Sequence, residues 1–455
     1  MNITVEEFII DFADKLNNEQ ISFFIGSGVS TELDLPNWKD LFKEIAEKLF
    51  LNIDEIHDYY QLAQYYCNKY SISDLKRIIS PKLQTYNFNS PTMEKLLKLQ
   101  FKSIWTTNFD NALENCLLAH RILYTKVHND KDLSCINTND TPVIYKINGD
   151  IADLENIILT QRDWENFEYT HPTMLTFLKK ELVSNSFLFL GYSFQDNLIK
   201  SALSSIRQFV GDSGIHHYAI FQKKEKQEFS YFIDDLDKNY NIKVVLVDDY
   251  AEIPKILDKI FLKSIERNIF ISGRLDDYDN KTEEFANNLL KKLSTDLLKY
   301  NWNLCTGMGR KIGYFVAGPA IQYLLSQSIK NIDKRIQIRP FDDNLTAKDF
   351  TNYRKLLIEQ NNILIFVFGQ KFINGKSENS KGVLEEFELA KKMGKIIIPI
   401  GSTGFAAHEI WEEVNRNITK YPYLEQYKYL LAKETDVNKI TSAIISILNS
   451  IIDIR

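Results

Sequence analysis

Cysteine is scarce in this chain of 455 residues, and its four copies stand far apart. Cys67, Cys116, Cys135 and Cys305 include no C-x-x-C pair, which is the spacing that zinc ribbons use. Separations of 49, 19 and 170 residues give no disulfide framework either. The sequence therefore predicts neither a bound metal ion nor disulfide stabilisation.

Long apolar runs and an excess of positive charge are also missing. The longest apolar run, residues 363–368, is the size of a strand, whereas a membrane span needs about 18 residues. Lysine and arginine total 55 against 61 aspartate and glutamate, so the formal net charge is −6. Binding to nucleic-acid phosphates generally needs a basic face. We expect a protein that binds neither membrane nor nucleic acid.

The first residues lack the basic and apolar segments of a secretory signal, because Glu6, Glu7 and Asp11 follow closely on the start. This pattern predicts a cytoplasmic protein. The composition, with 44% apolar, 13% aromatic and 25% charged residues, is that of ordinary globular domains. At about 150 residues per domain, the length predicts two or three of them.

Short apolar runs alternate with amphipathic helical stretches along the whole chain. They lie at 21–25, 103–105, 143–147, 187–190, 217–221 and 242–247, and then at 268–274, 303–305, 335–338, 363–368 and 395–400. Such alternation is typical of a parallel sheet covered on both faces by helices. The pattern restarts after a helix at 251–264, so we predict two α/β domains with parallel, Rossmann-like sheets, at 1–265 and 266–455.

Four polar strings follow predicted strands in the first domain. They are Gly26-Ser27-Gly28-Val29-Ser30, Trp105-Thr106-Thr107-Asn108-Phe109-Asp110, Lys146-Ile147-Asn148-Gly149-Asp150 and Gly191-Tyr192-Ser193-Phe194-Gln195-Asp196. Ligands of open parallel sheets bind beyond the carboxyl ends of the strands. Each string alone is also explained by a tight turn, a helix cap or an Asx turn.

Taken together and in this order, the four strings resemble the bacterial branch of the sirtuin-like family, over about residues 15–260. The resemblance implies binding of NAD+ and cleavage of its nicotinamide–ribose bond. It assigns substrate binding to Gly26, Ser27, Gly28, Ser30, Thr107, Gly191, Ser193 and Asp196. It further implies that Asn108 positions the nicotinamide ribose or the attacking water, and that Asp110 holds a nearby hydroxyl or amide.

The chain departs from the family pattern at Asn148, where the family has a histidine before Gly149. A histidine there would take or relay a proton, whereas an amide orients a hydroxyl but accepts no proton. Asn148 is thus a candidate catalytic position with its base missing, through natural divergence or an engineered substitution.

Protein deacetylases of this family carry two C-x-x-C pairs around a structural zinc ion. This sequence has no such pair. Hydrolysis of NAD+ is therefore predicted over transfer of an acyl group from a protein lysine, and no metal is expected.

The second domain places polar residues at its own strand ends. Ser272, Gly273 and Arg274 follow the first strand, and residues 306–310, which include Gly307, follow the second. Basic side chains facing glycine-bearing turns make a plausible pocket for a phosphorylated nucleotide. As a set these residues resemble the SLOG domains, Rossmann-like relatives of nucleotide-processing enzymes. The Pro-Gly-Gly string of those enzymes is absent at 380–386, which favours ligand sensing over phosphoribohydrolase activity.

A sirtuin-like domain followed by a SLOG domain resembles the NAD+-consuming effectors of Thoeris antiphage defence. That resemblance implies activation by a cyclic ADP-ribose isomer, made by a partner TIR-domain protein, and depletion of NAD+ in the infected cell. It assigns the signal to Ser272, Gly273, Arg274, Gly307, Arg354, Lys371 and Glu386. It also implies a homo-oligomer, commonly a tetramer.

Three functional hypotheses follow from these patterns. The first is a regulated NAD+ glycohydrolase. The second, motivated by Asn148, is a catalytically inactive scaffold that binds NAD+ and responds to a nucleotide. The third, a protein-modifying sirtuin, is disfavoured by the missing cysteine pairs.

Overall fold

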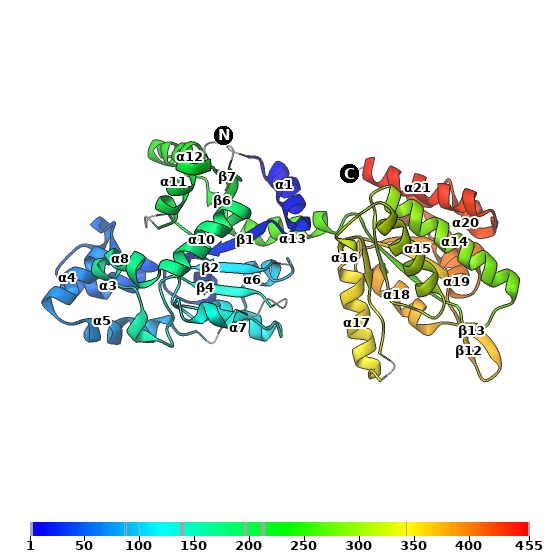
Figure 1. Cartoon of the computed structure of the whole chain (residues 1–455), viewed down its shortest axis with the longest axis horizontal. Coiled ribbons are helices and arrows are strands. Elements are labelled where there is room, and N and C mark those ends of the chain that lie inside the picture. The colour runs from blue at the N-terminus through cyan, green and yellow to red at the C-terminus, as the bar shows by residue number, and fades with distance from the viewer. Residues whose placement is uncertain are drawn as a thin grey trace. The chain divides into compact units, whose positions relative to one another are not determined.

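The computed structural model of the chain describes residues 3–85, 87, 89–99, 101–136, 141–194, 198–210, 214–342 and 344–453, without the side chains at 209–210 and 452–453. The chain divides into two compact units, residues 1–264 and 265–455 (Figure 1). Each unit is described by itself below.

Unit 1 is built on a parallel sheet of seven strands in the order β3-β4-β2-β1-β5-β6-β7. The strands are β1 (Ile21–Ile25), β2 (Ser103–Thr106), β3 (Thr125–Val127), β4 (Val143–Lys146), β5 (Ser186–Leu190), β6 (His217–Gln222) and β7 (Ile242–Val247). The helices are α1 (Val5–Asn17), α2 (Ser27–Ser30), α3 (Trp38–Lys48), α4 (Tyr59–Lys69), α5 (Ile72–Ile79), α6 (Pro91–Leu96), α7 (Ala112–Ala119), α8 (Gln161–Glu165), α9 (Phe167–Thr170), α10 (Pro172–Ser184), α11 (Leu198–Val210), α12 (Gln227–Tyr240) and α13 (Ile253–Ser264).

Alternating side chains of the central strands fill two separate cores. Phe23 and Ile25 of β1 pack with α1, α6, α7 and α13, while Phe24 between them packs with α10, α11 and α12 on the other face. Successive side chains of a strand point to opposite faces. A strand that is apolar at every position is therefore buried on both sides, as the continuous run at 21–25 predicts.

A third core joins α3, α4 and α5 in a small helical cluster. Phe42, Leu62 and Leu75 are buried in it, and Phe109, which follows β2, contributes to it as well. The cluster therefore packs against the loop after β2, at the carboxyl edge of the sheet.

Unit 2 repeats the arrangement with a parallel sheet in the order β10-β9-β8-β11-β14 and a separate hairpin of β12 and β13. Its strands are β8 (Asn268–Arg274), β9 (Asn303–Thr306), β10 (Ile336–Ile338), β11 (Ile363–Phe368), β12 (Gln370–Ile373), β13 (Lys376–Asn379) and β14 (Ile396–Pro399). Its helices are α14 (Asn280–Lys299), α15 (Ile312–Ser326), α16 (Ile332–Arg335), α17 (Ala347–Glu359), α18 (Lys381–Lys392), α19 (Phe405–Arg416), α20 (Lys428–Lys433) and α21 (Val437–Asp453).

The predicted fold class, two α/β domains with parallel sheets, is confirmed. Three local expectations differ. Residues 26–28 form the start of the short helix α2, where a tight turn was predicted. Arg335, predicted to begin a strand, is the last residue of α16. The β12–β13 hairpin follows β11 directly and was not predicted, because its polar sequence carries no apolar run. Among the described residues, no helix has the length and apolar character to cross a membrane.

One buried histidine makes the stability of unit 1 depend on pH. His217 begins β6 and is 2% exposed, and its Nδ1 accepts a hydrogen bond of 3.2 Å from the backbone N–H of Phe187. Burial lowers the pKa of His217 from 6.5 to about 3. Between about pH 6.5 and 3, His217 is therefore protonated in the unfolded chain and neutral in the folded chain. The free energy of unfolding falls as the pH drops through this range.

We predict that His217→Asn, which keeps an acceptor for Phe187 but cannot ionise, flattens this dependence. The slope of the unfolding free energy against pH should decrease by about 1.4 kcal/mol per pH unit between about pH 4 and 6. Urea unfolding at several pH values, with unit 1 followed by hydrogen exchange of β5 and β6, measures the slope. The exposed His57→Asn should leave it unchanged, and an unaltered slope in His217→Asn would contradict the assignment.

Candidate functional site

Four neighbouring strands bring the four predicted strings to one edge of unit 1. Strands β4, β2, β1 and β5 are adjacent in that order and all parallel. Their carboxyl ends therefore lie side by side, and the segments that follow them meet there. The structure thus gathers 26–30, 106–110, 147–150 and 191–194 at this edge. Asp196, predicted for the last string, lies outside the described residues.

The glycines of this edge allow two backbones to approach closely. A Cβ at Gly26 would lie 2.3 Å from the carbonyl oxygen of Gly191, and one at Gly191, where φ is +63°, would lie 2.5 Å from the nitrogen of Val29. The N–H groups of Gly26 and Gly28 donate to the carbonyls of Leu190 and Gly191. Those two donors are engaged within the protein, so the glycines are required here by packing.

Three buried polar side chains connect the segment after β1 with the segment after β2. The amide nitrogen of Asn108 donates to Ser30 Oγ at 3.0 Å, and Ser30 Oγ donates to Asp110 Oδ2 at 3.0 Å. The other oxygen of Asp110 accepts from the N–H of Ala112 at 3.0 Å. The side chains of Ser30, Asn108 and Asp110 are at most 7% exposed. Three predicted residues from two separate strings therefore form one hydrogen-bonded unit.

Asn148 is fixed beside this unit and is fully buried. Its amide nitrogen donates to the hydroxyl of Tyr60 at 2.9 Å and to the carbonyl of Thr107 at 3.1 Å. The Oδ1 atoms of Asn148 and Asn108 are both buried without a hydrogen-bond partner within the described part of the protein. Buried acceptors are rarely left unpaired, and two of them here indicate a place prepared for a donor such as a hydroxyl or a water.

Burial and charge oppose each other at Asp110. Burial raises the pKa of this carboxyl, the charge of Lys146 and the hydrogen bonds from Ala112 and Ser30 lower it, and the balance is a pKa above the usual value. A carboxylate with a raised pKa is a better proton acceptor than an ordinary one near neutral pH.

Two cavities open over this edge of the sheet. One, of about 770 Å³, has aromatic walls from α3, α4, α8 and α9, and the other, of about 1170 Å³, extends toward β6 and α12. Both are lined by Gly28, His57, Gly191 and Ser193. Volumes of several hundred Å³ suit small-molecule sites. The two cavities therefore share part of their lining.

The predicted residues divide into those that line the cavities and those that lie behind them. Ser27, Gly28, Gly191 and Ser193 line the first cavity. Asn108, Asp110 and Asn148 are not among its described lining residues, and Tyr60, which does line it, holds Asn148 from the cavity side. Tyr60 was missed by the sequence analysis, because nothing in a helical segment marks one tyrosine as the neighbour of a residue 88 positions away.

Unit 2 brings five of its seven predicted residues together. Ser272 Oγ donates to Glu386 Oε2 at 2.5 Å, and the guanidinium of Arg354 pairs with Glu385 at 2.7 Å and Glu386 at 3.4 Å. Burial raises the pKa of Glu386, against the hydrogen bond from Ser272 and the charge of Arg354. The positive charge of Arg354 is thus already paired with two carboxylates of the cluster.

An aromatic side chain, Phe341, links Gly307 to the same cluster. The Arg354 guanidinium lies 5.3 Å from the ring centre of Phe341. A Cβ at Gly307 would lie 2.7 Å from that phenylalanine, and one at Gly273 would lie 2.5 Å from the carbonyl of Val367. Both glycines are therefore needed for close packing, Gly307 against Phe341 and Gly273 against Val367.

The other two predicted residues of unit 2 stand apart. Arg274 makes two hydrogen bonds to Asp276, of 2.7 and 2.9 Å, and Asp276 also accepts from the N–H of Phe372 on the hairpin. Lys371 lies on the same hairpin strand. The hydrogen bonds and ion pairs of the described residues do not join Lys371 to Arg354.

Metal-ligating side chains are not grouped in the part of the chain that the structure describes. No three or more histidine, cysteine, aspartate or glutamate residues there are arranged to hold a metal ion, and the four cysteines are free thiols.

Known proteins match both halves of the chain. Residues 102–245 match the SIR2-like domain, and residues 252–451 match the Sir2- and TIR-associating SLOG family. The second match begins before unit 2 and includes α13. The predicted resemblance to a sirtuin-like domain followed by a SLOG domain is thereby confirmed.

Several relatives align with this arrangement. The NAD(+) hydrolase ThsA of Bacillus cereus (strain MSX-D12) is 28% identical over 471 residues, covering 100% of this chain and 98% of its own. The NAD(+) hydrolase ThsA of Cytobacillus dafuensis is 29% identical over 442 residues, covering 91% of this chain and 89% of its own. Defense-associated sirtuin 2 of Bacillus subtilis is 24% identical over 216 residues, 46% of this chain and 21% of its own.

Proposed function

The chain carries a SIR2-like domain followed by a Sir2- and TIR-associating SLOG domain, and on that premise we propose that it is an NAD+ glycohydrolase of antiphage defence, controlled by a nucleotide bound to unit 2. The full-length alignment with proteins named NAD(+) hydrolase supports this proposal. Among the structural observations, the one that carries it is the pair of buried, unpartnered amide oxygens of Asn108 and Asn148, two residues that do not themselves line the cavities.

The dinucleotide would lie across the two cavities, over the shared residues Gly28, Gly191 and Ser193. The larger cavity is lined by Lys200, Lys224 and Lys226, together with several aromatic side chains. Lysines there complement the two phosphates of NAD+. The aromatic rings provide flat apolar surfaces for a base.

The proposed reaction needs positioning more than strong acid–base chemistry. Nicotinamide leaves as a neutral molecule when its bond to the ribose breaks and takes the bonding electrons, and a water adds to the ribose carbon and loses a proton. Asn108 would orient the water or the ribose hydroxyl through its unpartnered oxygen. Asp110, with its raised pKa, would receive the proton, and Asn148 would hold a hydroxyl.

Access to these residues requires a movement of Tyr60. Its hydroxyl accepts the hydrogen bond from Asn148, and its side chain lines the cavity. A ribose that reaches Asn148 must therefore displace Tyr60 or replace its hydroxyl as the partner of the amide.

In unit 2 we propose that a cyclic ADP-ribose isomer, supplied by a TIR-domain partner protein, binds at the Ser272, Arg354 and Glu386 cluster. Arg354 forms ion pairs with Glu385 and Glu386 in this structure. An anionic ligand would have to replace these carboxylates as the partner of the guanidinium. Glu385 and Glu386 would then be free to form new contacts with other residues, and this change would transmit ligand binding. We further propose that the chain acts in the cytoplasm as a homo-oligomer, a tetramer by the family resemblance. Its activity there would deplete NAD+.

The direct test is release of nicotinamide from NAD+ by the purified chain, with and without cyclic ADP-ribose isomers. We predict that Asn108→Ala abolishes the release, because the ribose or water loses its orienting group, while thermal melting shows that the fold stays intact. Asn68→Ala, an exposed asparagine on α4, is the matched control and should retain full release. Normal release by folded Asn108→Ala would remove this residue from the mechanism.

The alternative, an inactive NAD+-binding scaffold, is favoured by one observation: Asn148 has no ionisable group where the family places a histidine. We predict that Asn148→His raises activated nicotinamide release at least about tenfold, because general acid–base help is typically worth about 10²–10⁴-fold. NAD+ affinity should change little, since imidazole and amide both form hydrogen bonds.

The control is Asn148→Gln, which enlarges the side chain without making it ionisable. If the histidine variant is no faster than Asn148→Gln while NAD+ still binds, then Asp110 already serves as the base or the site binds without turnover. Release by the chain with Asn148 unchanged separates these two outcomes.

We predict that Lys371→Ala or Arg354→Ala weakens binding of the cyclic ADP-ribose isomer by about 1.5–3 kcal/mol, the value of a hydrogen bond to a charged group. Calorimetry measures this change, and binding of NAD+ to unit 1 should be unaffected. Lys376→Ala, on the paired strand of the same hairpin, is the control for Lys371. Because Arg354→Ala leaves Glu386 unpaired, the melting of unit 2 is recorded beside it. Full affinity in both variants would remove these residues from the signal site.

A further inference from the structure

A lysine without an assigned role lies directly beneath the candidate catalytic residues. Lys146 is the last residue of β4, and its side chain is 1% exposed. Its ammonium lies 2.9 Å from Glu114 Oε1 and 2.8 Å from Asp150 Oδ2. Burial lowers the pKa of Lys146, but these two carboxylates outweigh it and hold that pKa above its usual value. Lys146 is therefore a buried cation at neutral pH.

The same ammonium also contacts the backbone of the loop after β2. It donates to the carbonyl oxygen of Phe109 at 3.2 Å and to that of Asp110. A lysine ammonium has three N–H bonds, and here they serve four acceptors from three segments: helix α7, the loop after β2, and the turn after β4. The side chain thus joins two loops that neighbour each other at the sheet edge.

These two loops carry the candidate catalytic groups. Asn108 directly precedes Phe109, whose carbonyl Lys146 binds, and Asn148 is two residues from Asp150, whose carboxylate Lys146 binds. The loops are otherwise joined by backbone hydrogen bonds from Ile147 and Ile151 and by the Asn148 side chain. Lys146 adds a charged contact that a single group makes to both loops.

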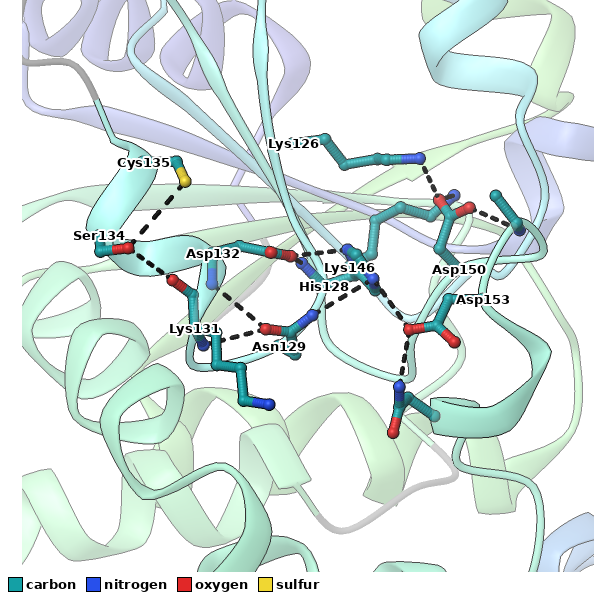
Figure 2. Close-up of polar contacts among 12 residues, drawn as sticks. Lys126, His128, Asn129, Lys131, Asp132, Ser134, Cys135, Lys146, Asp150 and Asp153 are labelled. Carbon is teal, nitrogen blue, oxygen red and sulfur yellow. Dashed lines mark hydrogen bonds and ion pairs between the residues drawn. The ribbon is translucent and has the colours of Figure 1, made fainter.

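A second lysine of the same network provides a natural comparison. Lys126 of β3 donates to the same oxygen of Asp150 at 2.9 Å, and its side chain is 30% exposed (Figure 2). Its ammonium lies 3.9 Å from Glu114. The contacts of Lys126 within the described structure do not extend to the carbonyls of Phe109 and Asp110. The two lysines share the carboxylates of Glu114 and Asp150. They differ in that only Lys146, among these two, contacts the loop after β2.

We propose that Lys146 is a positioning residue for the hydrolysis of NAD+: its ammonium holds the carbonyls of Phe109 and Asp110 and the carboxylate of Asp150, and so sets the spacing between Asn108 and Asn148. This inference rests on the proposed function. Lys146 lies below the cavities and touches no substrate. It acts on turnover through the two loops, because a displacement of about 1 Å in reacting groups can cost about 10²-fold in rate.

The test compares Lys146→Met, Lys146→Arg and Lys126→Met in the full chain, by steady-state nicotinamide release with a panel of cyclic ADP-ribose isomers and by thermal melting. Lys146→Met removes the charge and all four contacts. Lys146→Arg keeps the charge and the ion pairs, but its planar guanidinium cannot place three donors around one point. Lys126→Met removes a charge and one contact to Asp150 from the same network, and it leaves the contacts of Lys146 to the carbonyls of Phe109 and Asp110 in place.

We expect kcat to fall about 10–100-fold in Lys146→Met and in Lys146→Arg, with KM for NAD+ unchanged, and to stay at the wild-type value in Lys126→Met. Lys146→Arg should melt near the wild type, so it carries the test if Lys146→Met fails to fold. Wild-type kcat in a folded Lys146 variant, or an equal fall in Lys126→Met, would overturn the proposal. A wild-type chain that binds NAD+ but releases no nicotinamide would overturn the proposed hydrolysis, and this role with it.

Discussion

The parallel pairing of β1 with β2 on one side and β5 on the other is the constraint on which the candidate site depends. It places the start of α2, which follows β1, against the turn after β5 so closely that only glycine fits at positions 26, 28 and 191. It also sets Ser30 beside the Asn108 and Asp110 loop, because the two strands end at the same edge. A substitution that separated these turns would disturb the hydrogen-bonded unit of Ser30, Asn108 and Asp110 without touching any of the three.

Burial gives this edge its chemistry and also limits it. Polar groups that are removed from water are costly unless each is paired, and here most are: Asp110 by Ser30 and Ala112, Lys146 by two carboxylates and two carbonyls. The exceptions among the described residues of this edge are the amide oxygens of Asn108, Asn111 and Asn148 and one carboxylate oxygen of Glu114. Tyr60, whose side chain lines the first cavity, accepts the hydrogen bond of the Asn148 amide and so separates Asn148 from that cavity.

Unit 2 uses the same sheet architecture for a different electrostatic arrangement. Its cluster contains a buried glutamate and an arginine that are already paired, with a serine hydroxyl on Glu386. Breaking a buried ion pair leaves a charge without a partner, which costs several kcal/mol. A ligand must therefore replace the contacts that it displaces, and an anion that binds Arg354 would at the same time release Glu385 or Glu386. Such an exchange is a physical means by which ligand binding could change the surrounding structure.

The sequence by itself determined the fold class and the strings at the strand ends, because apolar periodicity and strand-terminal motifs are local properties of the chain. The domain bounds at 1–265 and 266–455 stay a prediction. Asp196 stays a prediction, as do the roles of the other assigned residues. Only the tertiary structure decided which of them touch: that Asn148 meets Tyr60, that Lys146 binds the loop after β2, and that Lys371 stands apart from Arg354. These contacts join residues up to 88 positions apart, and the order of strands in the sheet, which no local pattern encodes, brings them together.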